Sequence, residues 1–393
     1  MKIDIFNEIQ DPRPWREGHE QDRFRQAIEQ AKLADELGYG CWWQVEHHGA
    51  EEFSLSSAPE LLLAAISQHT SSIRLGHSAV LAPARFNHPI RVAERAATLD
   101  HLSAGRVELG LTRSTAPEWR LFGIDPEQVR PQTQQAFEMV PRMWTTERFS
   151  YHGDGYQIDD VPISPKPYQK PHPPLWQAAA SPSSFEDAGR RGVGVLGTTL
   201  WESLERVRRM TGLYRAAVGR CENPVGAFVN DQIAFFTFVH CAETDEEAMR
   251  GGAAAAAAWY TVTALGFFEA RAAFLENLAR HQALLDDPAG GGLTGEFLRE
   301  EVNEPPTPAQ LVIGRILEGE QVPDDEIFEV LSAQDSLIVG SPETCRKKLR
   351  VYADLGIDRL MCFHQVGQLS HEQVLTSIRL IGELIPEFDP GRK

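Results

Sequence analysis

The sequence predicts an α/β protein of the TIM-barrel type, a (β/α)8 barrel with insertions after strands four and seven. Eight strand-like segments, each followed by a segment of helical period, extend from the first residues to the last. Short turns between such segments imply parallel strands, and eight of these units close into a barrel. An open doubly wound sheet is disfavoured, because no Gly-x-Gly-x-x-Gly motif follows the first strand.

The first half of the chain is predicted to form four regular strand-and-helix units. Gly38 ends the first helical pattern, and Pro59 suits the first turn of the second helix. The strands are predicted at residues 2–7, 41–45, 73–80 and 107–112, and the helices at residues 22–37, 58–70, 90–103 and 132–144.

Two insertions interrupt the second half of what we expect to be a single barrel domain, residues 1–393. Residues 151–174 contain two glycines and then a proline-rich run, which predicts a hairpin over one end of the barrel. Residues 246–334 are mostly helical, and such insertions often form a lid or an oligomer contact. The later strands are predicted at residues 175–180, 193–198, 232–241 and 358–363, and the later helices at residues 184–191, 202–218, 342–355 and 371–385.

Composition and charge limit the classes of function. With 38 Lys and Arg against 56 Asp and Glu, the net charge is −18, which disfavours nucleic acid and anionic membranes as partners. The five cysteines form no Cys-x-x-Cys pair, so we expect neither a disulfide framework nor a structural zinc site. No signal-peptide pattern opens the chain, and residues 251–268 are rich in Ala, which drives membrane insertion poorly. We therefore predict a cytoplasmic protein.

Glu46, His47 and His48 directly follow a short apolar strand and form the most informative motif of the chain. Ionisable side chains are costly to bury unpaired, and barrel enzymes keep their chemistry at the carboxyl ends of strands. The triplet therefore fits an active site or a polar strand end that is hydrogen-bonded to a loop. A metal site is not predicted, because consecutive strand residues point to opposite faces.

The triplet and several further segments together resemble the bacterial luciferase-like, flavin-dependent monooxygenases. The resemblance covers nearly the whole chain and is weakest in residues 246–334. No single segment is specific, but their order and spacing are. The segments are WWQVEHH at residues 42–48, NHP at 87–89, LDHLSAGRVELGLTR at 99–113, LFG at 121–123 and GSPE at 340–343.

The resemblance implies a (β/α)8 barrel that is commonly dimeric, so a homodimer is expected. It also implies a two-component, FMN-dependent monooxygenase, to which a separate flavin reductase supplies reduced FMN. With dioxygen, such an enzyme oxygenates a small organic substrate through a flavin peroxide. We expect a medium-sized apolar or carbonyl-bearing organic molecule as the substrate.

The resemblance also assigns roles to individual residues. His47 matches the catalytic histidine of the family, and Glu46 and His48 match its neighbours. Arg113 matches the arginine that contacts the flavin phosphate, and Ser181 matches the serine of the phosphate-binding loop after the fifth strand.

Four further residues complete the predicted site. A cis peptide bond under the flavin is a feature of related proteins, which places one here between Ser78 and Ala79. Asn7 and His364 end the first and eighth strands. They are predicted at the flavin edge or in the substrate pocket, although hydrogen bonding to loops would explain them equally.

Alternatives stay open at the phosphate positions. Arg113 suits bidentate phosphate binding, which we favour over the alternative of an ion pair with Glu118 or another carboxylate at the barrel mouth. The serines after the fifth strand suit either a phosphate or a helix N-cap, and the N-cap role is expected of Ser183 or Ser184 before Ser181.

Two departures from the luciferase pattern argue against light emission as the role. Ala180 stands where the luciferase α-subunit has an acidic residue, and Thr112 stands where it often has a reactive cysteine. Two other functions fit the chain less well: a deazaflavin-dependent oxidoreductase and a non-catalytic flavin-binding protein. The luciferase-type triplet disfavours the first, and eight complete strand patterns disfavour the second.

Overall fold

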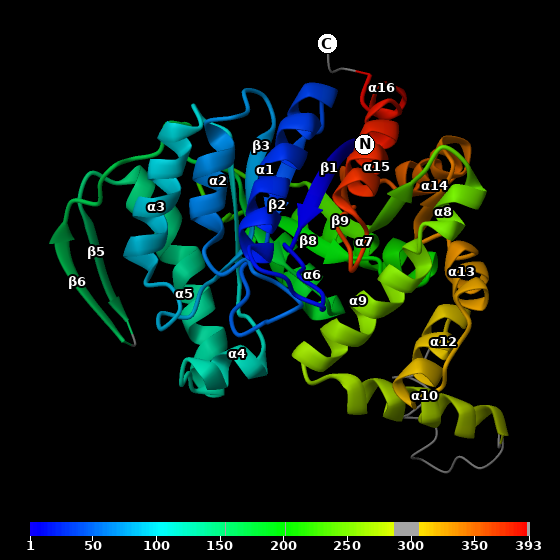
Figure 1. Cartoon of the computed structure of the whole chain (residues 1–393). Helices are drawn as coiled ribbons and strands as arrows, with labels where there is room; N and C mark the ends of the chain where they lie inside the picture. The colour runs from blue at the N-terminus through cyan, green and yellow to red at the C-terminus, as the bar shows by residue number, and fades with distance from the viewer. Residues whose placement is uncertain (154, 201, 287–305, 391–393) are drawn as a thin grey trace.

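A closed barrel of eight parallel strands forms the centre of the molecule, in agreement with the predicted fold class (Figure 1). The computed structural model describes residues 1–153, 155–200, 202–286 and 306–390. Each strand pairs with the next along the chain, β8 pairs with β9, and β11 returns to β1 to close the barrel. The strands are β1 (Lys2–Asn7), β2 (Cys41–Gln44), β3 (Arg74–Leu81), β4 (Val107–Thr112), β7 (Leu175–Ala178), β8 (Gly194–Thr198), β9 (Ile233–Cys241) and β11 (Arg359–Phe363).

Helices surround the barrel, because each crossover returns the chain along the outside of the sheet. Neighbouring helices pack side by side, and α1 contacts both α2 and α15. A short helix between β4 and α5, α4 (Ala116–Leu121), was not predicted, since six residues are too few to show a period. The other helices are α1 (His19–Leu37), α2 (Pro59–Ser67), α3 (Pro89–Leu102), α5 (Pro126–Thr145), α6 (Pro182–Arg191), α7 (Leu204–Val218), α14 (Pro342–Asp354), α15 (His371–Gly382) and α16 (Ile385–Phe388).

The insertion after β9 is helical, as predicted, and ends in a short strand that was not predicted. That strand, β10 (Ile338–Gly340), pairs in parallel with the end of β9. The helices are α8 (Asp245–Arg250), α9 (Ala253–Phe267), α10 (Arg271–Asp286), α12 (Pro308–Leu317) and α13 (Asp324–Ser332). Among the described residues, no helix combines the length and the apolar character needed to span a bilayer.

The hairpin β5 (Phe149–Gly153) and β6 (Tyr156–Val161) is present, but its predicted position over one end of the barrel is wrong. It lies outside α3 and α5, at the left of Figure 1. Tyr151 donates to Glu138 of α5, and Arg142 of α5 lies over the Phe149 ring. These contacts with α5 hold the hairpin at the side of the barrel.

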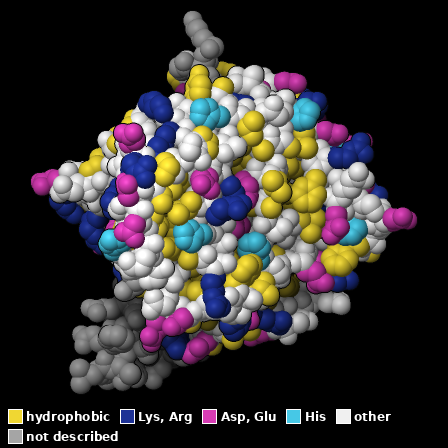
Figure 2. Space-filling view, turned by 90° about the vertical axis from the view of Figure 1, so that its left-hand side faces the viewer, with side chains coloured by type: hydrophobic (Ala, Val, Ile, Leu, Met, Phe, Trp, Pro, Cys, Tyr) yellow, Lys and Arg dark blue, Asp and Glu magenta, His cyan; other side chains and the backbone are white. Residues whose placement is uncertain are grey.

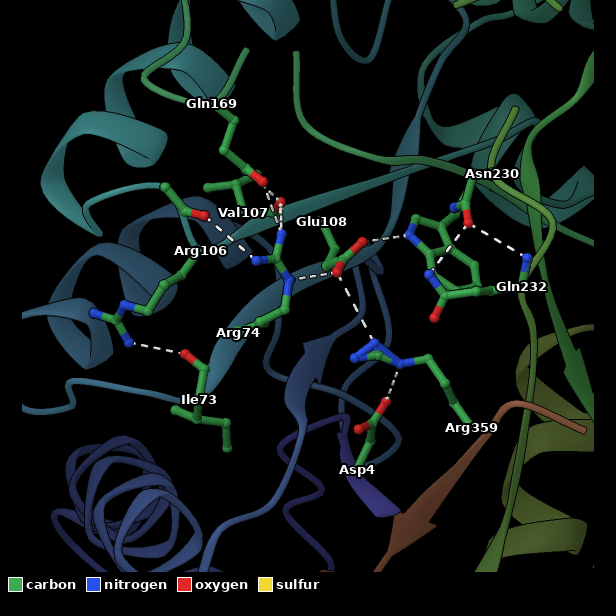
Figure 3. Close-up of polar contacts among 12 residues, drawn as sticks. Asp4, Ile73, Arg74, Arg106, Val107, Glu108, Gln169, Asn230, Gln232 and Arg359 are labelled. Atoms are coloured by element: carbon green, nitrogen blue, oxygen red, sulfur yellow. Dashed lines mark hydrogen bonds and ion pairs between the residues drawn. The ribbon is translucent and has the colours of Figure 1, made fainter. Parts of the chain in front are cut away.

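Buried polar side chains fill the amino end of the barrel (Figure 3). The Arg359 guanidinium donates to Asp4 at 2.9 Å and lies 3.9 Å from Glu108. Two indoles complete the layer: Trp43 donates to Asp4 at 2.9 Å, and Trp176 donates to Glu108 at 2.7 Å. This end is packed with side chains, so space for a ligand remains at the carboxyl ends of the strands.

Candidate active site

A cavity of about 450 Å³ lies at the carboxyl ends of the strands, within the usual size range of ligand pockets. Side chains from the ends of the barrel strands, the start of α6 and helix α9 line it. The predicted site residues that line it are Glu46, His47, Ser78, Ala79, Arg113 and Ser181. The structure thus brings the predicted histidine and the predicted phosphate residues to one cavity.

His47 is held in place by a buried carboxylate. Its Nδ1 lies 3.4 Å from Glu118 Oε1, and its backbone N–H donates to the Ser56 carbonyl at 3.0 Å. The rings of Phe267 and Phe268 lie against the imidazole, with centroids 5.4 and 5.7 Å away. With Nδ1 directed to Glu118, Nε2 is the atom left for a molecule in the cavity.

Glu118 is the partner of the histidines and not of Arg113. Burial raises the pKa of Glu118, but hydrogen bonds outweigh that effect and hold the pKa below its usual range. Besides His47, the donors are the His48 backbone N–H at 3.0 Å and the Ser114 hydroxyl at 2.5 Å. The alternative of an Arg113–Glu118 ion pair is therefore wrong. Glu118 stays ionised near neutral pH and can stabilise a protonated His47.

Glu46 lines the cavity, and His48 lies beside Glu46 and outside the cavity. Burial raises the pKa of Glu46, but hydrogen bonds from His48, His77 and Asn87 outweigh it and hold the pKa well below its usual range. His48 Nε2 lies 3.3 Å from Glu46, and its ring stacks on Phe86. His48 does not line the cavity, contrary to what its predicted place in the catalytic group requires, and a catalytic role for it stays a prediction. Successive residues leave β2 in opposite directions.

Asn7 and His364 also lie away from the cavity, contrary to the prediction. Phe6 and Glu8 line it instead, because side chains alternate along β1 and its continuation and Asn7 points the other way. His364 Nδ1 lies 2.8 Å from the Ser377 hydroxyl on α15, in the layer between barrel and helices. Burial, with His240 nearby, lowers the pKa of His364 to about 3, so it stays neutral.

Arg113 and the start of α6 form another part of the cavity lining. The Arg113 side chain is exposed and forms no ion pair with any residue that the structure describes. Ser181, not Ser183 or Ser184, is the N-cap of α6, because Pro182 takes the first helical position. The hydroxyl of Ser181 accepts from the Ser184 N–H at 3.4 Å.

The peptide bond between Ser78 and Ala79 is cis, as predicted, and both residues line the cavity. Leu111, Leu196 and Phe236 continue an apolar wall beside them. An apolar wall suits a flat ring system, and an arginine beside a helix N-terminus suits a phosphate. The residues therefore fit FMN.

Sequence reasoning missed many residues of the cavity, among them Glu8, Glu118, Arg191 and Tyr260. Strand alternation gives Glu8, which is two residues after Phe6. Arg191 ends α6 and donates to Gln177 at 2.5 Å. Tyr260 lies in the insertion, where no motif indicated it.

A model of the luciferase-like monooxygenase family matches residues 9–359 of the chain. The oxygenase component of the flavin-dependent trigonelline monooxygenase of Acinetobacter baylyi is 29% identical over 228 residues, 57% of this chain and 61% of that protein. The chain spans about half the length of the curated relatives it matches, 54%, 61% and 47% of the first three.

Solved structures share the fold over the whole chain. A monooxygenase from Streptomyces bottropensis has a TM-score of 0.71 at 24% identity, covering 99% of this chain and 100% of that one. The oxygenating constituent of the 3,6-diketocamphane monooxygenase of Pseudomonas putida, solved with FMN, has a TM-score of 0.70 at 18% identity, covering 98% and 97%. An F420-dependent secondary alcohol dehydrogenase has a TM-score of 0.61 at 17% identity, covering 98% of both chains.

Proposed function

The chain belongs to the luciferase-like monooxygenase family, and from this we propose that it is a two-component, FMN-dependent monooxygenase. A separate flavin reductase supplies reduced FMN in this proposal, and dioxygen and a small organic molecule are the substrates. A homodimer and a cytoplasmic location stay predictions from the sequence.

One observation supports the proposal above all others. A single cavity combines an oriented histidine, His47, with Arg113, which forms no ion pair among the described residues, and with the start of α6 at Ser181. The strands that precede His47 and Ser181 are three steps apart around the barrel. A ligand with a phosphate at one end and a reacting ring at the other would contact both groups.

Each group has a defined task in this proposal. Arg113 and the N–H groups of the α6 start bind the phosphate, while Ala79, Leu111 and Leu196 exclude water from the ring. Reduced FMN, when bound, supplies the electrons for dioxygen activation. His47 exchanges a proton through Nε2, and Glu118 stabilises its charged form.

The substrate end of the cavity favours an apolar molecule. Phe6, Phe236 and Phe268 line it, together with Tyr260 from the insertion. These rings offer dispersion contacts and few charges. We propose a medium-sized organic substrate with one polar group close to His47.

Titration with FMN tests the proposal directly. Purified protein should bind FMN, and Arg113→Ala should weaken binding about tenfold or more, because a charge-assisted hydrogen bond contributes roughly 1.5–3 kcal/mol. Arg209→Ala is the matched control, since Arg209 is exposed on α7 and does not line the cavity. His47→Ala should bind FMN normally but slow product formation about tenfold or more in a screen with a generic flavin reductase.

Three results would contradict the proposal. Equal FMN affinity of the Arg113 and Arg209 variants would remove the phosphate site. Binding of F420 in preference to FMN would favour the deazaflavin-dependent oxidoreductase, a function found among solved structures that share this fold. FMN binding without oxygen consumption coupled to any substrate would favour a non-catalytic flavin-binding protein.

A further inference from the structure

Glu8 is a buried carboxyl group that lines the cavity and has no role in the mechanism above. It follows β1, and only 3% of its surface is exposed. Phe6, two residues earlier, faces the same cavity. A carboxyl group at the wall of an aromatic cavity is costly unless it is paired or protonated, so its surroundings decide its state.

Two neutral donors hold the Glu8 carboxyl. Tyr260 Oη of α9 donates to Oε1 at 3.2 Å, and Gln10 Nε2 donates to Oε2 at 3.2 Å. No Lys or Arg of the described residues forms an ion pair with Glu8. The titratable groups that act on it are His47, after β2, and Tyr260, on α9.

The protonation of Glu8 changes near neutral pH. Burial raises its pKa to about 7, against the opposing influence of His47 and of the Gln10 and Tyr260 hydrogen bonds. Burial also raises the pKa of Tyr260 well above its usual value, so Tyr260 stays a neutral donor. Glu8 can therefore give or take a proton within the cavity at cell pH.

We propose that Glu8 is a second proton-exchanging residue of this cavity, which works with His47 on the bound molecule. The inference rests on the proposed function only for the identity of that molecule. The geometry supports it, because Glu8 and His47 line the same cavity and because Tyr260 and Gln10 already donate hydrogen bonds to the Glu8 carboxyl.

The proton balance is simple. The O–H bond of the Glu8 carboxyl breaks, and its proton bonds to an oxygen or nitrogen of the bound molecule. Tyr260 and Gln10 stabilise the carboxylate that remains. A protonated His47 then returns a proton to Glu8 through a water molecule between them, and the partly exposed imidazole takes another proton from solvent. The net result is one proton moved from solvent to the bound molecule.

The experiment measures the carboxyl group in the protein alone and then the reaction of the FMN-loaded protein. Infrared difference spectra between pH 5 and pH 9 follow the carbonyl stretch of protonated carboxyl groups. The wild type should show a transition near pH 7 that Glu8→Gln lacks. His47→Gln and Tyr260→Phe should move it to higher pH, since each removes a group that favours the carboxylate. Glu372→Gln, an exposed carboxyl on α15, should leave it unchanged.

The second measurement is the reoxidation of bound, reduced FMN by dioxygen across the same pH range. In the wild type, the reoxidation rate should change with pH around pH 7. In Glu8→Gln this pH dependence should disappear and the rate should fall about tenfold or more, with unchanged FMN affinity. In Glu8→Asp the pH dependence should remain.

A neutral-pH infrared transition that persists in Glu8→Gln, or a pH profile identical to that of the wild type, overturns the inference. Failure of the wild type to bind FMN overturns the proposed function instead, because the infrared titration and its shift in His47→Gln test Glu8 without a flavin.

Discussion

At the scale of single residues, the site depends on which carboxyl groups keep their charge. Glu46 and Glu118 each accept several hydrogen bonds, and their pKa values fall although both are buried. Glu8 accepts two, both from neutral groups, and its pKa rises. All three carboxyl groups are buried, so the difference in pKa comes from the number and charge of their hydrogen-bond donors. Glu46 and Glu118 therefore stay ionised, whereas Glu8 changes its protonation near neutral pH.

This difference predicts a pH-dependent stability of Glu8→Gln. The Glu8 pKa rises from 4.5 to about 7 on folding. Below pH 4.5 the Glu8 carboxyl is protonated in the folded and the unfolded chain, so its ionisation does not affect stability. Between pH 4.5 and pH 7 the unfolded chain ionises first, which increasingly favours unfolding. Relative to wild type, Glu8→Gln should therefore gain free energy of unfolding across this range, up to about 3 kcal/mol, and level off above it.

Urea unfolding at pH 4.5, 6 and 8 measures this gain. Glu372→Gln, exposed on α15, controls for the substitution and should differ from wild type by a constant amount. A Glu8→Gln difference that does not change with pH would refute the raised pKa.

At the scale of elements, the strands of the barrel pair large side chains with glycines. Trp43 of β2 lies opposite Gly76 of β3, and Trp176 of β7 lies opposite Gly194 of β8. The two indoles meet edge to face inside the barrel, with centroids 5.2 Å apart. Because glycine has no side chain, each indole can lie against the backbone of the neighbouring strand at the position of its glycine.

Gly76→Ala should therefore destabilise the protein by about 1–3 kcal/mol through overpacking. A Cβ at Gly76 would lie 2.1 Å from a carbon of the Trp43 ring, in a closed interior. Gly212→Ala is the control, because Gly212 is exposed in α7 with no atom within 4 Å, and it should gain roughly 0.5–1 kcal/mol. Thermal unfolding measures the change in stability of both variants relative to wild type. An equal change in the two variants would refute the packing argument.

The helix α9 is the element through which the insertion reaches the site. Tyr260 contacts Glu8, and Phe267 and Phe268 at its end contact His47. Residues 287–305, a further part of the predicted lid or oligomer contact, lie outside the described residues. The lid role of the insertion stays a prediction, supported so far by α9 alone.

At the scale of the whole molecule, charged side chains on the surface and in the barrel interior contribute differently to stability. The face shown in Figure 2 carries acidic and basic side chains with hydrophobic side chains between them. Inside, the pair of Arg359 and Asp4, 1% and 0% exposed, spans the closing strands β11 and β1. Exposed pairs contribute little to stability, whereas a buried charge that loses its partner is costly.

Arg359→Met should therefore cost about 3–5 kcal/mol of unfolding free energy, because Asp4 stays buried without its cation. Arg208→Met, which breaks the exposed pair with Glu205, should cost less than about 1 kcal/mol. Urea unfolding compares the two. A loss in Arg359→Met no larger than in Arg208→Met would show that the network does not stabilise the barrel.

The sequence by itself determined the barrel, because eight alternations of strand and helix period leave few ways to arrange the chain. It also placed His47, Arg113 and Ser181 at one cavity, since parallel strands end on the same side. Only the tertiary structure decided which side chains meet there. Glu8 and Tyr260 are 252 residues apart, and His47 and Glu118 are 71 apart. Local periodicity reports which residues are buried and not which partners they find, so the hairpin, Asn7, His48 and His364 were misplaced.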